Sequence, residues 1–562
     1  MGKTHDGWDV MKNRPWVQNY DPDVSPNLEY PEIPLSTILE EAAFSIPEQI
    51  CLVYLNYSYS FRDIYNASEK VAKFLVARGI QKGDRVGIIL PNSPDFIIAF
   101  FGILKAGGVV VAINPKFKRA EIEYVINDSE IGVLFLQKST SITMLDDRER
   151  ITPLLRIICP VDPGSFENNL WQENEIQHKY EYSLHEVLSS DTRIHRLPDL
   201  GPEDPAIFQY SGGTTGIPKA AIGLHRNLIA NIYQFYAWLK GIEGEKEVFL
   251  SVIPLYHVYG MVLTMCLAIK MKSTQVLLPN PQDINGILQA IKFHKVTIFP
   301  SVPNMFSAIL NSKQSLEDQI SFDNLKVCIS GSAPLDRIIK NDFESKTGSR
   351  IVEGYGLSEA PTATHCNPVK GINKPGSIGM PLPDVDCRIV DLETGTYDVD
   401  YGDRGELILR GPQVMIGYHK REDETKITIK EGWLYTGDIA YADEDGYFFI
   451  AGRIKDLIKV SGFQVWPREI EEIILKFPGI KEATVAGIKN TETGERPKAW
   501  IILKDNYSID IGELRVYCRK FLADYKVPLE FEIIKEFPRT TVGKILRREL
   551  VRLDEEKNHP GD

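Results

Sequence analysis

Short apolar runs alternate with segments of helical periodicity through the first two-thirds of this chain. The run Arg85 to Leu90 stops at a proline, a helical pattern extends to Lys105, and the β-branched run Val109 to Ile113 follows. Ser93-Pro94 is typical of a helix start, with serine as the N-cap and proline at the first helical position. Strands that alternate with helices of this length predict an α/β fold with a mostly parallel sheet covered by helices.

The pattern of predicted secondary structure changes beyond Ile378. Short strands separated by Gly-Asp and Asp-Gly turns predict a small, antiparallel β region. The last part of the chain then reads as a compact α+β segment. A length of 562 residues is several times that of a typical domain, so at least two domains are expected. We place a large N-terminal domain at 1–454 and a small α+β domain at 455–562.

Charge and cysteine content exclude several classes of function. Lys and Arg number 64 against 77 Asp and Glu, a net charge of −13, which disfavours nucleic-acid binding but leaves a local basic pocket open. The seven cysteines form no CxxC pair, which indicates reduced thiols and no zinc framework. The longest apolar stretch, Phe96 to Leu104, is too short to span a bilayer, and the start lacks a secretory signal. We expect a cytoplasmic protein without a membrane span.

One loop is rich in glycine and hydroxyl groups. It reads Tyr210-Ser-Gly-Gly-Thr-Thr-Gly-Ile-Pro-Lys219 and follows an apolar run directly. Glycines let a backbone approach an anion closely, and the hydroxyls and the lysine add donors and charge, so the loop predicts phosphate binding. It is not a Walker A loop, because proline precedes the lysine. The alternative, an ordinary surface loop, is less consistent with this density of glycine and hydroxyl groups.

Four further motifs follow the loop in a fixed order. They are Tyr355-Gly-Leu-Ser-Glu359, Tyr435-Thr-Gly-Asp438, Gly452-Arg-Ile-Lys-Asp456 and Pro538-Arg-Thr-Thr-Val-Gly-Lys544. With them the chain closely resembles the adenylate-forming superfamily, which contains acyl-CoA synthetases, peptide-synthetase adenylation domains and luciferases. The resemblance runs from about residue 35 to about residue 550. Within the superfamily, the chain most resembles AMP-forming fatty acyl-CoA ligases.

The resemblance implies ATP, Mg²⁺ and coenzyme A as ligands, and it assigns roles to individual residues. Lys544 corresponds to the lysine between the substrate carboxylate and the α-phosphate. Asp438 corresponds to the residue that accepts hydrogen bonds from both ribose hydroxyls, and Arg453 would add ribose or phosphate contacts. Glu359, with Thr214, corresponds to the Mg²⁺ site, which suits the preference of this ion for few carboxylates plus phosphate oxygens. The phosphate-binding loop would comprise Ser211, Gly212, Gly213, Thr214, Thr215, Gly216 and Lys219.

Two further groups of residues are carried over by the same resemblance. The walls of the adenine pocket would comprise Gly331, Ser332, Ala333, Glu353, Gly354, Tyr355, Gly356 and Ser358. The hinge between the domains and the face that lines the thiol tunnel would comprise Lys455, Lys459, Ser461, Gly462 and Phe463. The small domain would then serve the two half-reactions in two orientations.

The segment Pro254-Leu-Tyr-His257-Val-Tyr-Gly260 bears on the acid substrate. His257 resembles the acyl-site histidine of the family, although a histidine packed in a core is the alternative reading. The surroundings are apolar and offer no evident charged partner for an amino group. We therefore expect a medium- to long-chain fatty acid, with a short hydroxy acid or an aryl acid as alternatives.

Other functions stay open at this stage. A luciferase-like monooxygenase would use the same adenylation step, and a non-catalytic binding protein could retain the fold. The intact set Lys219, Glu359, Asp438, Arg453 and Lys544 argues against the latter. The sequence also leaves a monomer and a homodimer open.

Overall fold

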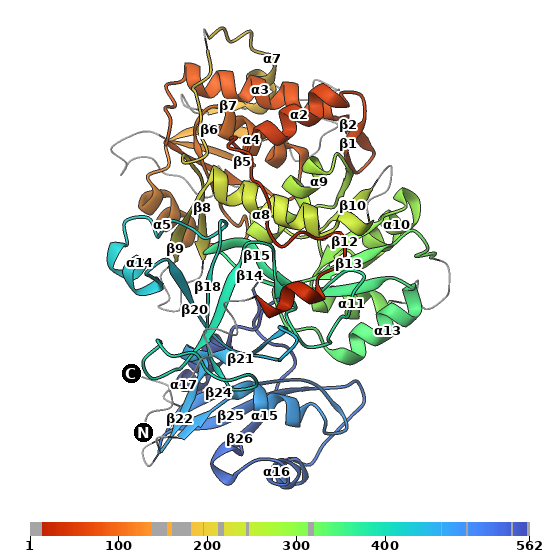
Figure 1. Ribbon diagram of the computed structural model, residues 1–562, viewed down its shortest axis with the longest axis vertical. Helices are drawn as coiled ribbons and strands as arrows, with labels where there is room; N and C mark the ends of the chain where they lie inside the picture. The colour runs from red at the N-terminus through yellow and green to blue at the C-terminus, as the bar shows by residue number, and fades with distance from the viewer. Residues whose placement is uncertain are drawn as a thin grey trace. The chain divides into compact units, whose positions relative to one another are not determined.

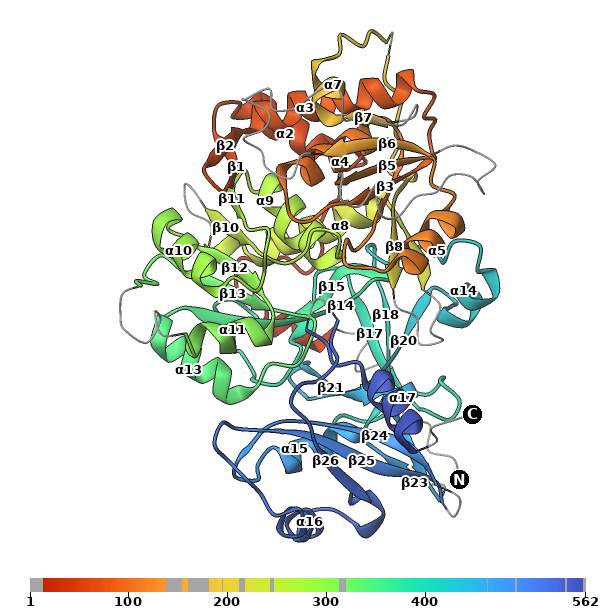
Figure 2. The same ribbon diagram turned by 180° about the vertical axis from the view of Figure 1, so that it is seen from behind.

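The structure is a computed structural model that describes residues 14–137, 154–159, 181–194, 196–211, 218–242, 247–312, 320–461, 463–490, 493–540 and 543–558. The chain divides into two compact units. The larger unit comprises Trp16–Asp386 and Arg410–Leu434. The smaller unit contains Cys387–Leu409 and Tyr435–Asp562. Figures 1 and 2 show the elements of both units from opposite sides.

The larger unit contains a seven-stranded sheet in the order β7-β6-β5-β3-β4-β8-β9. All neighbours in it are parallel except β8 and β9, which form an antiparallel pair. The strands are β3 (Arg85–Ile89), β4 (Val109–Ala112), β5 (Val133–Gln137), β6 (Leu155–Cys159), β7 (Glu181–Ser183), β8 (Pro205–Ser211) and β9 (Lys219–Leu224). The interior strand β4 is buried along its whole length, as a parallel strand with both faces covered should be.

The helices beside this sheet show why the local sequence folds as it does. In α4 (Pro94–Lys105) the Ser93 side chain accepts a hydrogen bond from the Phe96 N–H, and every residue of the helix is buried. Helix α3 (Phe61–Ala77) packs against α4 so closely that a Cβ at Gly102 would lie 2.5 Å from a methyl carbon of Val71. Figure 2 shows α3 and α7 (Leu184–Ser189) near β6 and β7. The other helices here are α2 (Thr37–Ser45) and α5 (Arg119–Ser129).

A nine-stranded sheet forms the rest of the larger unit, in the order β16-β15-β14-β13-β12-β10-β11-β1-β2. Its centre is parallel, and β2, β15 and β16 add antiparallel edges. The strands are β1 (Ile50–Tyr54), β2 (Tyr57–Ser60), β10 (Val248–Ser251), β11 (Thr274–Leu277), β12 (Ile298–Ser301), β13 (Val327–Ser330), β14 (Arg350–Leu357), β15 (Ala360–Cys366) and β16 (Met380–Pro381).

Helices follow the strands of this second sheet, and α10, α11 and α13 lie along it (Figure 2). The helices are α8 (His225–Trp238), a π-helix η6 (Tyr259–Cys266), α9 (Leu267–Lys270), α10 (Ile284–His294), α11 (Pro303–Leu310), α13 (Arg337–Thr347) and α14 (Glu422–Thr428). Short 3-10 turns are η1 (Pro15–Asn19) and η5 (Lys240–Ile242). Strand β19 (Ile429–Lys430) forms a small hairpin with the residues that follow it.

The smaller unit is built on two sheets. One has the order β17-β18-β20, with β21 paired to β20, and the other has the order β23-β22-β25-β24, with β26 paired to β25. The strands are β17 (Asp386–Val390), β18 (Gly405–Arg410), β20 (Trp433–Ala442), β21 (Phe448–Arg453), β22 (Ile458–Val460), β23 (Phe463–Val465), β24 (Ile480–Asn490), β25 (Gly494–Leu503) and β26 (Glu530–Ile533). The helical elements are η7 (Ile454–Asp456), α15 (Pro467–Ile474), α16 (Ile511–Arg519), η8 (Asp524–Lys526) and α17 (Arg547–Asn558).

The predicted α/β class is confirmed, because strands and helices alternate around largely parallel sheets as the sequence pattern indicates. The helical pattern that extends to Lys105 is α4, and α3 before it begins at Phe61, where Ser60 and Asp63 form a capping box. The division at 454/455 stays a prediction. Among the described residues, no helix is both long enough and apolar enough to cross a membrane.

Candidate active site

The carboxyl ends of β13 and β14 place the predicted adenine-pocket residues at one edge of a sheet. Because Ser330 lies opposite Glu353 in the parallel register, the turn at Gly331 and the Gly354-Tyr355 segment leave the sheet side by side. Ser332 has a left-handed backbone (φ 71°), and Ala333 lies in the same bend. Such strained, non-glycine positions concentrate at functional sites.

Two glycines of this region are required by close packing. A Cβ at Gly356 would lie 1.7 Å from the Thr362 carbonyl oxygen, because β14 and β15 run against each other there. A Cβ at Gly331 would lie 3.2 Å from the ring of Tyr259, so the adenine-side turn packs directly on the proposed acyl segment. The Tyr259 hydroxyl anchors that ring on the Ile329 carbonyl oxygen at 2.8 Å.

The Glu353 side chain is hydrogen-bonded to the backbone of two neighbouring segments. Its two carboxylate oxygens accept hydrogen bonds from the backbone N–H groups of Leu335 (3.4 Å) and Gly376 (3.1 Å). It therefore holds the 331–335 turn to the loop before β16. The Tyr355 ring packs edge-on against His365 at a centroid distance of 5.8 Å.

Lys219 and Glu359 lie in one polar cluster of the larger unit. Lys219 begins β9, and Glu359 lies with Ser358 in the turn between β14 and β15. Tyr418 joins the two: its hydroxyl donates to the Glu359 carboxylate at 2.8 Å, and the Lys219 ammonium lies 5.6 Å from the centre of its ring. Burial lowers the pKa of Lys219, while the Glu359 charge acts in the opposite direction.

Glu424 of α14 completes this polar cluster. Its carboxylate forms an ion pair with Lys219, and Arg421 lies 3.8 Å from its other oxygen. Ser211 ends β8 opposite Lys219 in the antiparallel pair of β8 and β9. The predicted loop residues Gly212, Gly213, Thr214, Thr215 and Gly216 lie outside the described residues, as does Gly462.

His257 lies just before the π-helix η6. Its Nδ1 accepts a hydrogen bond from the Tyr259 N–H at 3.2 Å, so the neutral ring carries its proton on Nε2. Burial lowers the pKa of the imidazole to about 4, which makes the ring uncharged at neutral pH. The π-helix that follows is apolar and buried throughout. π-helical turns are rare and occur mostly at functional sites.

The smaller unit gathers a second set of predicted residues. Asp438 and Arg453 lie opposite each other on β20 and β21, and their side chains form an ion pair at 2.7 Å. The Asp438 side chain is almost fully buried. Lys544 lies within their electrostatic field: burial and the Arg453 charge lower the pKa of its ammonium to about 8, and Asp438 and Asp456 act in the opposite direction. Residues from three separate motifs therefore come within electrostatic range of one another here.

The remaining predicted residues lie on η7 and on the hairpin of β22 and β23. Lys455 is the exposed central residue of η7. Lys459 and Ser461 are exposed, and the Lys459 N–H donates to Glu495 at 2.7 Å. Phe463 is 57% exposed and stacks on Tyr525 with ring centres 4.9 Å apart. The hairpin thus presents a polar and aromatic surface.

Comparison with known proteins assigns this arrangement to a family. Residues 39–419 match the AMP-binding enzyme family, and residues 469–544 match the AMP-binding enzyme C-terminal domain. The chain belongs to the AMP-binding enzyme family. It is 37% identical to the long-chain-fatty-acid–CoA ligase of Bacillus subtilis (strain 168), over 98% of this chain and 100% of that protein. It is 34% identical to the ligase of the same name from Escherichia coli O157:H7, over 95% and 97%.

A solved structure of this family superimposes on most of the chain. The anthranilate CoA ligase AuaEII, in complex with anthranoyl-AMP, covers 94% of this chain and 98% of its own, with 26% identity and a TM-score of 0.81. The predicted membership of the adenylate-forming superfamily is therefore confirmed. The prediction of an AMP-forming acyl-CoA synthetase that uses ATP, Mg²⁺ and coenzyme A is confirmed as well.

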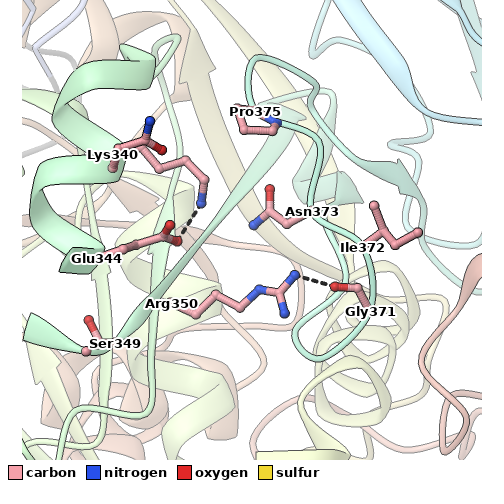
Figure 3. A pocket seen from close by; sticks show the side chains of 10 residues that line it. Lys340, Glu344, Ser349, Arg350, Gly371, Ile372, Asn373 and Pro375 are labelled. Atoms are coloured by element: carbon pink, nitrogen blue, oxygen red, sulfur yellow. Dashed lines mark hydrogen bonds and ion pairs between the residues drawn. The ribbon is translucent and has the colours of Figure 1, made fainter.

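A separate depression of about 450 Å³ lies beside α13 and the start of β14. Figure 3 shows that its charged groups are satisfied locally: Lys340 pairs with Glu344 of the same helix at 2.6 Å, and Arg350 donates to the Gly371 carbonyl oxygen. None of the residues that the family motifs identify lines it. We assign it no part in the reaction of this AMP-binding enzyme.

Sequence reasoning missed several members of the two clusters. Tyr418 and Glu424 contact Glu359 and Lys219, yet the segment that contains them has no distinctive motif. Asp456 lies inside a motif that was recognised, although only Arg453 and Lys455 were selected from it. The charge of Asp456, one residue past Lys455, was the available signal.

Proposed function

We propose that this AMP-binding enzyme joins long-chain fatty acids to coenzyme A through an acyl-adenylate. The observation that carries the proposal is the meeting of Lys544 with the Asp438–Arg453 pair in the smaller unit. Two cations and an acceptor for the ribose hydroxyls in one place suit the α-phosphate and ribose of ATP and the carboxylate that attacks this phosphate. The curated relatives named above, which are long-chain-fatty-acid–CoA ligases, support the choice of acid.

In the first half-reaction, a carboxylate oxygen of the acid bonds to the α-phosphorus of ATP while the bond to pyrophosphate breaks. Negative charge gathers on the phosphoryl oxygens, so fixed cations aimed at them lower the barrier. We assign Lys544 to the α-phosphate and the incoming carboxylate, and Lys219 to the departing polyphosphate. Asp438, which is buried, would accept hydrogen bonds from the ribose hydroxyls.

In the second half-reaction, the thiol sulfur of coenzyme A attacks the acyl carbonyl carbon and AMP departs with the electron pair. Lys544 is not needed for this step and would obstruct the thiol if it stayed. We therefore propose that η7 is the hinge between a domain at 1–454 and a domain at 455–562. The exposed hairpin that carries Lys459, Ser461 and Phe463 would then line the path of the thiol.

The residues around Glu359 fit a magnesium ion. Its carboxylate is a hard oxygen ligand next to Lys219, where polyphosphate would lie, and Mg²⁺ typically binds through one or two carboxylates plus phosphate oxygens. The Tyr418 hydroxyl fixes the orientation of this carboxylate. When bound, the ion would neutralise polyphosphate charge. Glu359 and Thr214 are the residues that we propose to hold it.

The acid pocket is proposed along His257 and the π-helix. The helix offers only uncharged side chains, and the imidazole is neutral at physiological pH, so an alkyl chain is favoured over a charged substituent. The ring of Tyr259, which packs on the adenine-side turn, would bring the acyl end next to the nucleotide. All seven cysteines are reduced and buried, which supports the cytoplasm as the location. A homodimer stays open.

The direct test is kcat/KM for acids from C2 to C18, with 4-hydroxybutyrate and 4-coumarate included, measured as pyrophosphate release and as thioester formation. We expect the highest values for long-chain acids. A maximum at 4-coumarate or 4-hydroxybutyrate would contradict the proposed substrate. Pyrophosphate release without any thioester, for every acid, would contradict the proposed ligase.

A further inference from the structure

Lys544 lies in a short hairpin that is fixed by its own backbone. We call residues 538–546 the Lys544 hairpin; residues 541 and 542 lie outside the described part of the chain. The Leu546 N–H donates to the Pro538 carbonyl oxygen at 2.8 Å, and the Thr540 N–H donates to the Lys544 carbonyl oxygen at 2.8 Å. The Lys544 N–H in turn donates to the Thr540 hydroxyl at 3.1 Å. The backbone position of the lysine is thus set within the hairpin.

Two arginines, one at the start of this hairpin and one directly after it, attach it to the rest of the smaller unit. On the N-terminal side, Arg539 donates to the Gly543 carbonyl oxygen at 3.0 Å and pairs with Glu482 of β24. On the C-terminal side, Arg547 donates to both oxygens of Glu471 of α15, at 2.8 and 3.0 Å. A planar guanidinium with two bonds to one carboxylate fixes orientation as well as distance.

The Glu471 carboxylate is a firm anchor. It is 9% exposed and also accepts hydrogen bonds from the Val485 N–H at 2.8 Å and from the Thr484 hydroxyl at 3.2 Å. Both of these groups belong to β24, the strand that also carries Glu482. Arg539 therefore attaches one end of the Lys544 hairpin to β24 directly. Arg547 attaches the other end to α15, which is itself bonded to β24 through Glu471.

Arg547 has one further contact, on the turn that we propose as the hinge. Its Nη1 donates to the Asp456 carboxylate at 3.2 Å, and Asp456 is the last residue of η7. One guanidinium thus connects η7, α15 and the start of α17. A change of backbone angles in η7 would be passed to the hairpin through this ion pair.

We propose that Arg539 and Arg547 are positioning residues that lock the Lys544 hairpin to β24, α15 and η7. The Lys544 backbone then keeps a fixed position relative to these three elements. The proposal rests on the proposed role of Lys544 in adenylation. It assigns to both arginines an effect on adenylation alone, because the second half-reaction does not use the lysine.

The test compares Arg547→Gln and Arg539→Gln with Arg552→Gln as the matched control. Arg552 lies on the same helix as Arg547, is 53% exposed in its side chain, and pairs only with glutamates of its own helix among the contacts of the described residues. We expect Arg547→Gln and Arg539→Gln to lower kcat for acyl-adenylate formation about tenfold or more, since small misplacements of a catalytic group are costly. KM for ATP and thioester formation from supplied acyl-adenylate should stay within about twofold of wild type, and Arg552→Gln should match wild type throughout.

Charge loss does not explain such a result. The Arg547 charge lowers the pKa of Lys544, so its removal would keep the lysine protonated and could not by itself slow adenylation at pH 7. Arg547→Lys keeps the charge without the planar fork, and we expect it to restore only part of the rate. If Arg547→Gln does not fold, as judged by its unfolding temperature, Arg539→Gln decides the question.

Lys544→Ala, measured in parallel, separates the two levels of the argument. If Lys544→Ala is slow in adenylation but both folded arginine variants equal Arg552→Gln, the positioning proposal is overturned and the proposed function stands. It is also overturned if the arginine variants slow both half-reactions to the same extent. If Lys544→Ala forms acyl-adenylate at the wild-type rate, the proposed role of the lysine itself is wrong.

Discussion

The adenylation half-reaction should lose rate as the pH rises above about 8, because in the proposed mechanism Lys544 must be protonated to neutralise the α-phosphate and the attacking carboxylate. Burial and the Arg453 and Arg547 charges lower the pKa of this ammonium to about 8, against the opposing effect of Asp438 and Asp456. The sign follows directly. A lowered lysine pKa means that the charged form is present below about pH 8 and is lost above it.

The size of the effect follows from the same value. A lysine with a pKa of about 8 is about nine-tenths protonated at pH 7 and about one-tenth protonated at pH 9. Adenylation should therefore slow by about tenfold between these two pH values. A lysine with the ordinary pKa of 10.5 would stay charged over the whole interval and would give a flat profile. Fatty acids are ionised throughout the interval, so the substrate carboxylate adds no trend of its own.

The assay is a single turnover of acyl-adenylate formation, with enzyme in excess over ATP, without coenzyme A and at constant ionic strength. Thioester formation from supplied acyl-adenylate is the internal control, and it should not fall over the same interval, because it uses the coenzyme A thiol rather than Lys544. Lys544→Ala should be slow and nearly independent of pH. A flat wild-type profile from pH 7 to 9, with Lys544→Ala still slow, would refute the reasoning about the charge of this buried lysine.

Three further outcomes are expected. Glu359→Gln should lower pyrophosphate release at least about tenfold and shift the Mg²⁺ dependence to higher concentrations, and a variant with unchanged Mg²⁺ dependence would show that this carboxylate is not a ligand. Met261→Ala should lengthen the preferred acid while KM for ATP stays the same, with a change of about 1–3 kcal/mol per methylene in kcat/KM, and an unaltered acid profile would place the π-helix outside the pocket. Lys455→Pro should keep adenylation but lose thioester formation, because proline fixes φ at the proposed hinge, and equal loss of both steps would contradict a hinge there.

Site residues could be selected from the sequence where they belong to a motif whose residue types indicate a chemical role. Asp438 and Arg453 come from separate motifs, and the antiparallel register of β20 and β21 places them face to face. Strand ends were equally readable: the turn after β13 and the segment after Glu353 were expected near each other, and parallel pairing brings them to one edge.

A contact could not be foreseen where one partner lies far away in the sequence and outside every motif. Arg547 and Asp456 are 91 positions apart, and Tyr418 and Glu359 are 59 apart, so only the fold reveals these pairs. The start of a helix can also be fixed by a local capping motif, which is harder to recognise in a sequence than the periodicity of apolar residues. The start of α3 at Phe61 is fixed by the Ser60–Asp63 capping box, which the apolar pattern used for the prediction does not register.

The π-helix that begins at Tyr259 has a consequence for how pockets of this kind can diversify. Its last turn is wide, as the hydrogen bond from the Leu267 N–H back to the Val262 carbonyl oxygen shows, and such a turn holds one residue more than an α-helical turn. Removing a single residue from this turn would let it relax into an α-helical turn and would change which of its side chains face the proposed acid pocket. Chain length, rather than side-chain size alone, then becomes a variable that changes which groups face the acid. Libraries that insert or delete one codon here would sample pocket shapes that no set of point substitutions can reach.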